Sequence, residues 1–67
     1  MDIKISTEFI KLDQLLKFSG VTGNGSDAKI LIFEKQVSVN GEIATQRGKK
    51  IRPGDIVTVG DLIINVC

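Results

Sequence analysis

Hydrophobic and polar residues alternate with two different periods along this chain, and the change of period divides it into a helical half and a strand half. Residues 2–5 alternate with a period of two, which predicts a short strand. Between about Thr7 and Ser19 the apolar residues recur at helical spacing, which predicts a first helix. Its apolar stripe consists of Phe9, Leu12, Leu15 and Leu16.

Local signals predict where this first helix starts and stops. Ser6 or Thr7 supplies an N-cap oxygen, and the helix dipole favours the carboxylate of Glu8 in the first turn. Gly20 is a C-terminal stop, because glycine readily adopts the positive φ that ends many helices.

A second helix is expected over about residues 26–35, with Ser26 or Asp27 as its cap. Ile30 and Phe33 make this helix apolar on more than one side, so we expect it to be sandwiched or partly exposed. Its inner face consists of Ala28, Leu31 and Ile32.

After Gln36 the period changes to two, and turn residues separate the apolar runs. Asn40-Gly41 predicts a hairpin turn because both residues tolerate positive φ, and Arg52–Asp55 predicts a turn with proline and glycine at its centre. Strands are expected at 37–39, 56–59 and 62–66. After the Asn40-Gly41 turn, residues 42–51 are expected to run back along the preceding strand, with irregular pairing. The last strand is expected to pair with the N-terminal one. The predicted fold class is α+β, an N-terminal helix pair packed on a small, mostly antiparallel sheet.

Length and composition narrow the functions open to this chain. Its 67 residues predict a single domain spanning 1–67, too small for a core plus a deep cavity of ~300 Å³. It has no histidine and one cysteine, Cys67, so the usual zinc sets and serine–histidine or cysteine–histidine pairs cannot be assembled. We therefore expect no enzyme activity, no cofactor, no metal and no small-molecule substrate, and Cys67 is expected to have no role.

The chain opens with no charged leader and apolar segment, and it has no apolar stretch near the ~18 residues of a membrane span. One cysteine forbids an internal disulfide, which is typical of a reducing compartment. A complete cytoplasmic protein without a membrane partner is expected.

Charge is unevenly distributed although the net charge is only +1. Residues 43–54 hold four basic residues and no acid, whereas the rest of the chain, with five basic and eight acidic residues, carries −3. Such a concentrated basic segment fits either a contact surface for nucleic acid or a solvated loop whose lysines protect a sheet edge. Charge alone leaves both open. The four cations are Arg47, Lys49, Lys50 and Arg52.

The order of several short motifs resembles a known family. These are Lys11-Leu12-Asp13 with Leu16, then Gly20, then Ser26, Ala28 and Ile32, then Val37-x-Val39-Asn40-Gly41, and finally Gly54-Asp55-x-Val57. The set covers about residues 8–59 and resembles the RNA-binding domain first described in ribosomal protein S-four, the alpha-L motif. The segment from Glu42 to Asp55, with Arg47-Gly48-Lys49-Lys50-Ile51-Arg52 inside it, is similar to the stand-alone bacterial YaaA-like subfamily.

The resemblance implies binding of structured RNA, with ribosomal RNA and ribosomal particles as candidate partners, through the helix pair and the adjoining loop. Lys11 stands where the family often has arginine, and Ser26 and Asp27 stand where many members have serine and arginine. Asp27 departs from that pattern, and Lys29 is expected to compensate in part. The full set of expected RNA contacts is Lys11, Ser26, Asp27, Lys29, Asn40, Gly41, Arg47, Gly48, Lys49, Lys50 and Arg52.

Each expected contact has its own chemistry. The start of the second helix offers free N–H groups and a positive dipole end to a phosphate, and Gly23, Gly25 and Ser26 keep side-chain bulk low there, although a tight turn alone would need the same residues. Arginine contacts phosphate with two parallel N–H donors, and lysine acts as a mobile point charge. Gly48 would let the backbone approach a groove. If the basic run is extended, its cations alternate between two faces, so two or three of them are expected to contact RNA.

Two other functions compete with RNA binding. A protein-interaction module would use Ile30 and Phe33 on the outer side of the second helix, although core or sheet packing of Phe33 is preferred to base stacking. A β-grasp carrier needs a C-terminal Gly-Gly, but this chain ends Asn65-Val66-Cys67. Residues 23–28 match a dinucleotide-binding pattern, which we reject because a helix rather than a strand precedes it.

Overall fold

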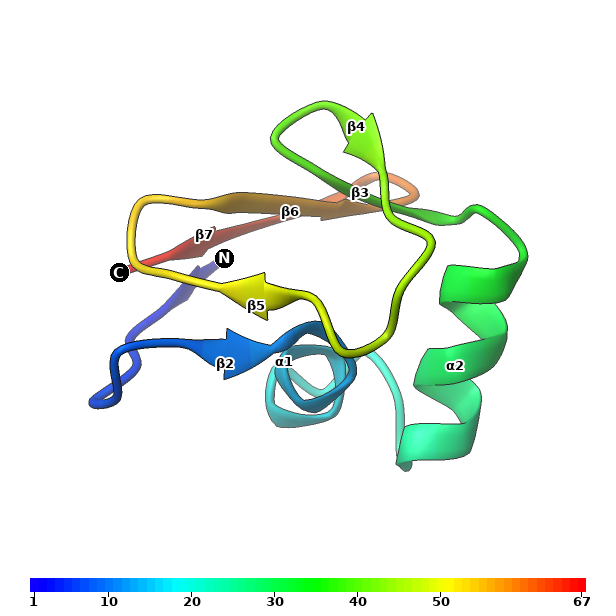
Figure 1. Cartoon of the computed structure of the whole chain (residues 1–67), viewed down its shortest axis with the longest axis horizontal. Helices are drawn as coiled ribbons and strands as arrows, with labels where there is room; N and C mark the ends of the chain where they lie inside the picture. The colour runs from blue at the N-terminus through cyan, green and yellow to red at the C-terminus, as the bar shows by residue number, and fades with distance from the viewer.

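The structure of the protein is a computed structural model of residues 1–67. It describes all of these residues, except that the burial of Gly25 is left out. Two helices, α1 (Leu12–Phe18) and α2 (Gly25–Phe33), lie on one side of a five-stranded sheet (Figure 1). A second sheet of two short strands lies beside α1. The predicted α+β class is confirmed.

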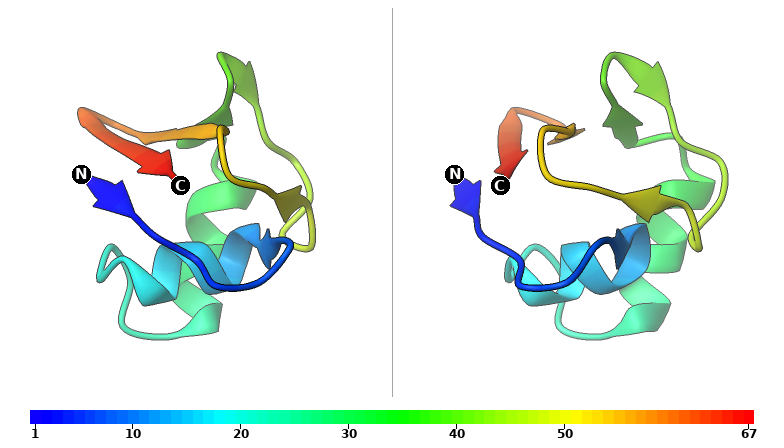
Figure 2. Two further views of the ribbon diagram at one scale, coloured as in Figure 1. Left: turned by 90° about the vertical axis from the view of Figure 1, so that its left-hand side faces the viewer. Right: turned by 60° about the vertical axis from the view of Figure 1, so that its left-hand side comes forward.

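The larger sheet has the strand order β1-β7-β6-β3-β4. β1 is parallel to β7, and the other neighbours are antiparallel. The predicted pairing of the last strand with the N-terminal one is thus confirmed, and it brings the two chain ends together (Figure 2). The strands are β1 (Asp2–Ile3), β3 (Val37–Val39), β4 (Glu42–Ile43), β6 (Ile56–Val59) and β7 (Leu62–Val66).

The first helix starts later than its sequence signals predict. The predicted start at Thr7 is wrong, because Ile10–Lys11 forms strand β2 and pairs with β5 (Lys50–Ile51). Pairing sets Ile10 opposite the fully buried Ile51, and burial of apolar surface outweighs the local capping signals. Lys11 is the N-cap, in an extended conformation and with no side-chain capping bond.

The predicted end of this helix is confirmed, with Ser19 as the C-cap and Gly20 at a φ of 83°. Thr7, expected to cap the helix, instead donates its Oγ1 hydrogen to the carbonyl oxygen of Phe9 at 2.8 Å.

The second helix is capped by Asn24, so the expected cap at Ser26 or Asp27 is wrong. The Asn24 side-chain oxygen accepts a hydrogen bond from the Asp27 N–H at 2.9 Å. Ala28 and Ile32 are buried as expected. Phe33 is 84% exposed, so the preferred core packing of this ring is wrong.

Both predicted turns are present. Asn40 and Gly41 have φ values of 53° and 86°, and Gly54 has a φ of 100°. Residues 42–51, expected to form one irregular strand after the turn, form two short strands in different sheets. β4 belongs to the larger sheet and β5 to the smaller one. Between them the chain turns at residues 46–49, where the Lys49 N–H donates to the Gln46 carbonyl at 3.3 Å.

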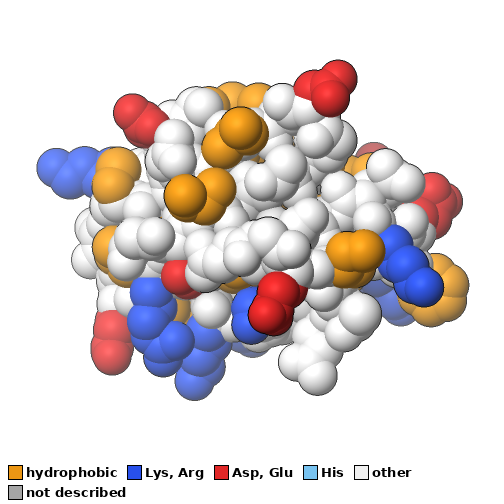
Figure 3. All heavy atoms as spheres, turned by 90° about the horizontal axis from the view of Figure 1, so that it is seen from above, with side chains coloured by type: hydrophobic (Ala, Val, Ile, Leu, Met, Phe, Trp, Pro, Cys, Tyr) orange, Lys and Arg blue, Asp and Glu red, His pale blue; other side chains and the backbone are white. Residues whose placement is uncertain are grey.

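One core joins the helix pair to the inner face of the larger sheet and to β5. The outer face of that sheet, seen in Figure 3, carries separate hydrophobic side chains among polar ones. A group of Lys and Arg side chains lies at the lower left of this view, and others lie at its left and right edges. In the part of the chain that the structure describes, no helix has the length and apolar character to cross a membrane. The core consists of Leu12, Leu15, Leu16, Ala28, Ile32, Val37, Val39, Ala44, Ile51, Val57, Ile64 and Val66.

Candidate nucleic-acid interface

Two lysines from distant parts of the sequence face each other on the β2–β5 ladder. Lys11 is the cross-strand partner of Lys50, and both side chains are exposed. The Lys50 ammonium lies 4.9 Å from the centroid of the Phe9 ring, a cation–π contact. Like charges directly opposite each other destabilise a sheet. An anion bound between these lysines would relieve that repulsion.

The turn at residues 46–49 is attached by its backbone to the start of α1. The N–H of Leu12 donates to the Lys49 carbonyl at 2.9 Å, and the N–H of Asp13 donates to the Arg47 carbonyl at 3.0 Å. These N–H groups belong to the first turn of the helix, where the N–H groups have no acceptor within the helix itself. The helix start therefore holds the basic turn in place, and the side chains of Arg47 and Lys49 are left exposed.

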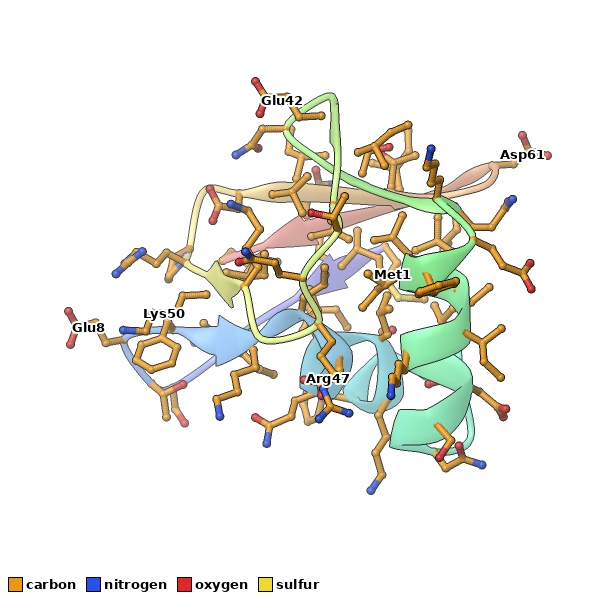
Figure 4. The ribbon with its side chains drawn as sticks, turned by 45° about the vertical axis from the view of Figure 1, so that its right-hand side comes forward. Met1, Glu8, Glu42, Arg47, Lys50 and Asp61 are labelled. Atoms are coloured by element: carbon orange, nitrogen blue, oxygen red, sulfur yellow. The ribbon has the colours of Figure 1, made fainter. Side chains whose placement is uncertain are left out.

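The basic run is extended only over β5, so its cations do not alternate regularly. Lys50 and Arg52 are exposed and Ile51 between them is buried. Figure 4 shows Arg47 near the helices and Lys50 at the other end of the same segment, close to Glu8. The cations thus form a row along the β5 side of the molecule, with the Glu8 carboxylate near Lys50 and the Asp55 carboxylate beside Arg52.

Gly48 lies at the centre of the exposed turn. A Cβ built at Gly48 would meet no described atom within 4 Å, and its φ is not in the left-handed region. The fold therefore does not require glycine here. A role in close approach to a ligand stays a prediction.

Asn40, expected as an RNA contact, connects two turns of the protein. Its Oδ1 accepts a hydrogen bond from the Ile56 N–H at 2.9 Å, and its Nδ2 donates to Asp55 Oδ1 at 3.1 Å. Asp55 Oδ2 accepts from the Arg52 N–H at 2.8 Å. The Arg52 N–H and then the Asn40 side chain lower the pKa of Asp55. Burial raises this pKa to a lesser extent, and the charges of Lys49 and Arg52 each lower it by less still.

Asn40 thus has a second structural role beyond the predicted hairpin turn, because its side chain connects this turn to Asp55 and Ile56. RNA contacts from this turn stay a prediction.

The middle of α2 contributes a cation next to the row. Lys29 and Arg47 line one hollow of about 240 Å³, together with Ile32, Phe33 and Thr45. The basic run was expected beside the start of the second helix. Arg47 instead lies against the middle and C-terminal end of α2, where Lys29, Ile32 and Phe33 line the same hollow. We call the exposed side chains of Lys11, Lys29, Arg47, Lys49 and Lys50 the basic surface.

Ser26 and Asp27 are exposed at the start of α2, but they offer less to a phosphate. The Asp27 N–H already donates to Asn24, and its carboxylate repels an anion.

Phe9, Phe33 and Thr45 lie at this interface and were not among the predicted contacts. Phe9 was assigned to the apolar stripe of a longer helix. The spacing of Lys29 and Phe33, four residues apart on a helix, could have indicated that they share a side.

The S4 domain model, the family of ribosomal protein S-four, matches residues 3–67. The chain belongs to the S4 domain family. The resemblance inferred from the ordered motifs is thereby confirmed.

Two relatives of this S4 chain are of comparable length. “Probable ribosome maturation protein RlbA” of Bacillus subtilis (strain 168) is 42% identical over 57 residues, which cover 85% of this chain and 80% of the relative. “Putative RNA-binding protein YbcJ” of Escherichia coli (strain K12) is 41% identical over 49 residues, which cover 73% of this chain and 70% of that protein.

A solved structure shares the fold. The crystal structure of a pseudouridylate synthase superposes with a TM-score of 0.76 at 23% identity, over 84% of this chain and 24% of the synthase. At that identity the likeness concerns the fold alone.

Proposed function

We propose that this S4 chain is a binding module for structured RNA, which it contacts through the basic surface. One observation carries the proposal: cations from β2, α2 and the 46–49 turn are exposed on one side of the molecule, and backbone hydrogen bonds to α1 hold the turn that carries two of them. Contacts from a fixed backbone suit recognition of phosphates and of RNA shape.

Ribosomal RNA, free or in ribosomal particles, is the partner we propose. Support comes from the relative in Bacillus subtilis, which is named for ribosome maturation, and from the relative in Escherichia coli, which is named for RNA binding. We propose a single domain that acts in the cytoplasm, where ribosomes assemble, by binding and without a reaction of its own.

The proposed contacts differ in strength. Lys11, Arg47, Lys49 and Lys50 are the main phosphate contacts, because they are exposed in one row. Lys29 extends that row to α2. Weaker contributions are proposed from Arg52, Gly48, Ser26, Asn40 and Gly41, and Asp27 opposes an anion at the helix start.

The test is RNA-binding anisotropy at several salt concentrations with structured ribosomal RNA fragments. Each phosphate contact contributes to the slope of log affinity against log salt, since binding releases counterions from the RNA. The double change Lys49→Ala with Lys50→Ala should flatten this slope by about one to two units.

Lys35→Asn serves as the control. Lys35 has a φ of 61°, which asparagine tolerates, and its neighbour Gln36 accepts a hydrogen bond from Gly60 at the β6–β7 turn, away from the basic surface. This change should leave the slope unaltered. An RNA affinity that depends neither on the salt concentration nor on the double lysine change would overturn the proposal.

A further inference from the structure

Phe33 is the most exposed of the large hydrophobic residues, at 84%, although it ends a helix whose inner face is well buried. An exposed phenylalanine contributes nothing to the core and leaves apolar surface in water. The composition makes this position more conspicuous, because the chain has three phenylalanines and no tryptophan or tyrosine.

Two cations stand beside this ring. Lys29 lies one turn before Phe33 on α2, so the two side chains share one side of the helix. Arg47 approaches from the turn held on α1, and Figure 4 shows it extending from that turn toward the helices. All three line the hollow of about 240 Å³, whose described lining residues include no acid.

The ring is also accessible from a second side. Phe33 and Lys29 line a further hollow of about 510 Å³ with Ser26, Ile30 and Glu34. The ring therefore stands as a ridge between two open spaces, and its apolar surface is open to a flat ligand.

We infer that Phe33, Lys29 and Arg47 form a subsite for an unpaired nucleotide of the bound RNA, an inference that rests on the proposed RNA-binding function. The unpaired base stacks on the Phe33 ring, and the phosphates on either side of it contact the Lys29 ammonium and the Arg47 guanidinium. Unpaired bases expose the flat faces that aromatic side chains recognise, whereas bases inside a double helix are covered by their neighbours.

Charge favours RNA over a protein partner for this surface. A purely apolar partner would leave Lys29 and Arg47 without counter-charge, but a nucleotide supplies an aromatic face and an anion together. The hollow is also continuous with the basic surface, because Arg47 belongs to both.

The first experiment compares two synthetic RNA hairpins that are closed by the same compact tetraloop, in which the loop bases stack on one another. The stem is fully paired in one hairpin and carries a single bulged adenosine in the other. Phe33→Ala should weaken binding of the bulged hairpin by about tenfold and leave the paired one nearly unchanged, since the loss of one base–aromatic stack corresponds to roughly that factor. Lys29→Gln and Arg47→Gln should weaken both hairpins, because phosphates flank paired and unpaired bases alike.

The matched control is Phe18→Ala. Phe18 is also exposed, at 65%, but it ends α1 and lines a hollow that shares no residue with the Phe33 site. This variant should bind both hairpins as the parent protein does.

The second experiment uses the absence of tryptophan from the sequence. Phe33→Trp creates a single indole at the proposed stack, and its fluorescence should be quenched by the bulged hairpin more than by the paired one. Phe18→Trp should show no such difference.

The outcomes separate this inference from the proposed function. If the parent protein binds neither hairpin with salt-dependent affinity, both are overturned. If it binds both but Phe33→Ala affects them equally, or Phe33→Trp fluorescence does not respond, the nucleotide subsite alone is overturned and the exposed ring is left to a protein partner.

Discussion

At the scale of single residues, Asp55 connects the turn after β3 with the turn before β6. One carboxylate oxygen accepts from Asn40 and the other accepts from the Arg52 N–H. Both hydrogen bonds favour the charged form and lower its pKa below the ordinary value of 3.8. The carboxylate therefore stabilises the folded state at pH values above about 3.8, and this contribution is lost as the pH falls through the lower folded pKa.

Asp55→Asn tests this linkage. The variant should be less stable than the parent by about 1 kcal/mol at neutral pH, because charge-assisted hydrogen bonds are replaced by weaker ones. The difference should shrink as the pH falls below the unfolded value. Urea unfolding followed by far-UV circular dichroism at several pH values measures it, and a difference that stays constant into acid would contradict the assignment.

At the scale of elements, the β2–β5 ladder combines an apolar pair with a charged one. Ile10 and Ile51 pack toward the core, and Lys11 and Lys50 face each other in solvent. The apolar pair explains why the ladder forms, and the lysine pair works against it. Such a like-charged pair is typical of a binding surface, where residues that serve the ligand lower the stability of the free protein.

Lys11→Gln should separate these two effects. It removes the repulsion but leaves the contact between Lys50 and Phe9, so the free energy of unfolding should rise by about 0.3 kcal/mol at low salt, with the gain disappearing at high salt. RNA affinity should fall in the same variant. Lys17→Gln is the control, because Lys17 lies in the last turn of α1, where its charge is favourable, and its loss should lower stability slightly.

The helix boundaries show which elements local sequence could predict. Gly20 ends α1 where expected, because a positive φ is a property of one residue and its neighbours. The start of α1 was misplaced, because Ser6, Thr7 and Glu8 form a plausible local cap and only the distant β5 competes for Ile10. The same error affected the predicted site. Lys11 was expected on the first helix, but it lies on strand β2 opposite Lys50.

At the scale of the whole molecule, one core supports both the fold and the basic surface. Leu12, Leu15 and Leu16 of α1 are fully buried in the core that also contains residues of the larger sheet and Ile51 of β5. The start of the same helix holds the 46–49 turn. A chain of 67 residues has little stability in reserve. Damage to this core should therefore remove the interface together with the fold.

Leu16→Ala should cost about 2–5 kcal/mol, which is comparable to the total stability of a domain this small. We expect largely unfolded protein by circular dichroism, with helix and strand signals lost in one transition. Adding a large excess of structured ribosomal RNA should recover part of the folded signal, because a ligand that binds only the folded state stabilises it by mass action. A stable Leu16→Ala protein, or two separate transitions, would show that the two layers do not share one core.

The sequence by itself determined the features that depend on neighbouring residues and on ordered motifs. The Asn40-Gly41 turn, the turn at Gly54 and the three central strands followed from local backbone preference and spacing. The ordered motifs carried the resemblance to the S4 family. Apart from the β1–β7 pairing, which the sequence predicted, only the tertiary structure decided which distant surfaces meet, because each segment by itself does not specify its partner. It put Lys11 against Lys50, attached the basic turn to α1, and left Phe33 exposed beside Lys29 and Arg47.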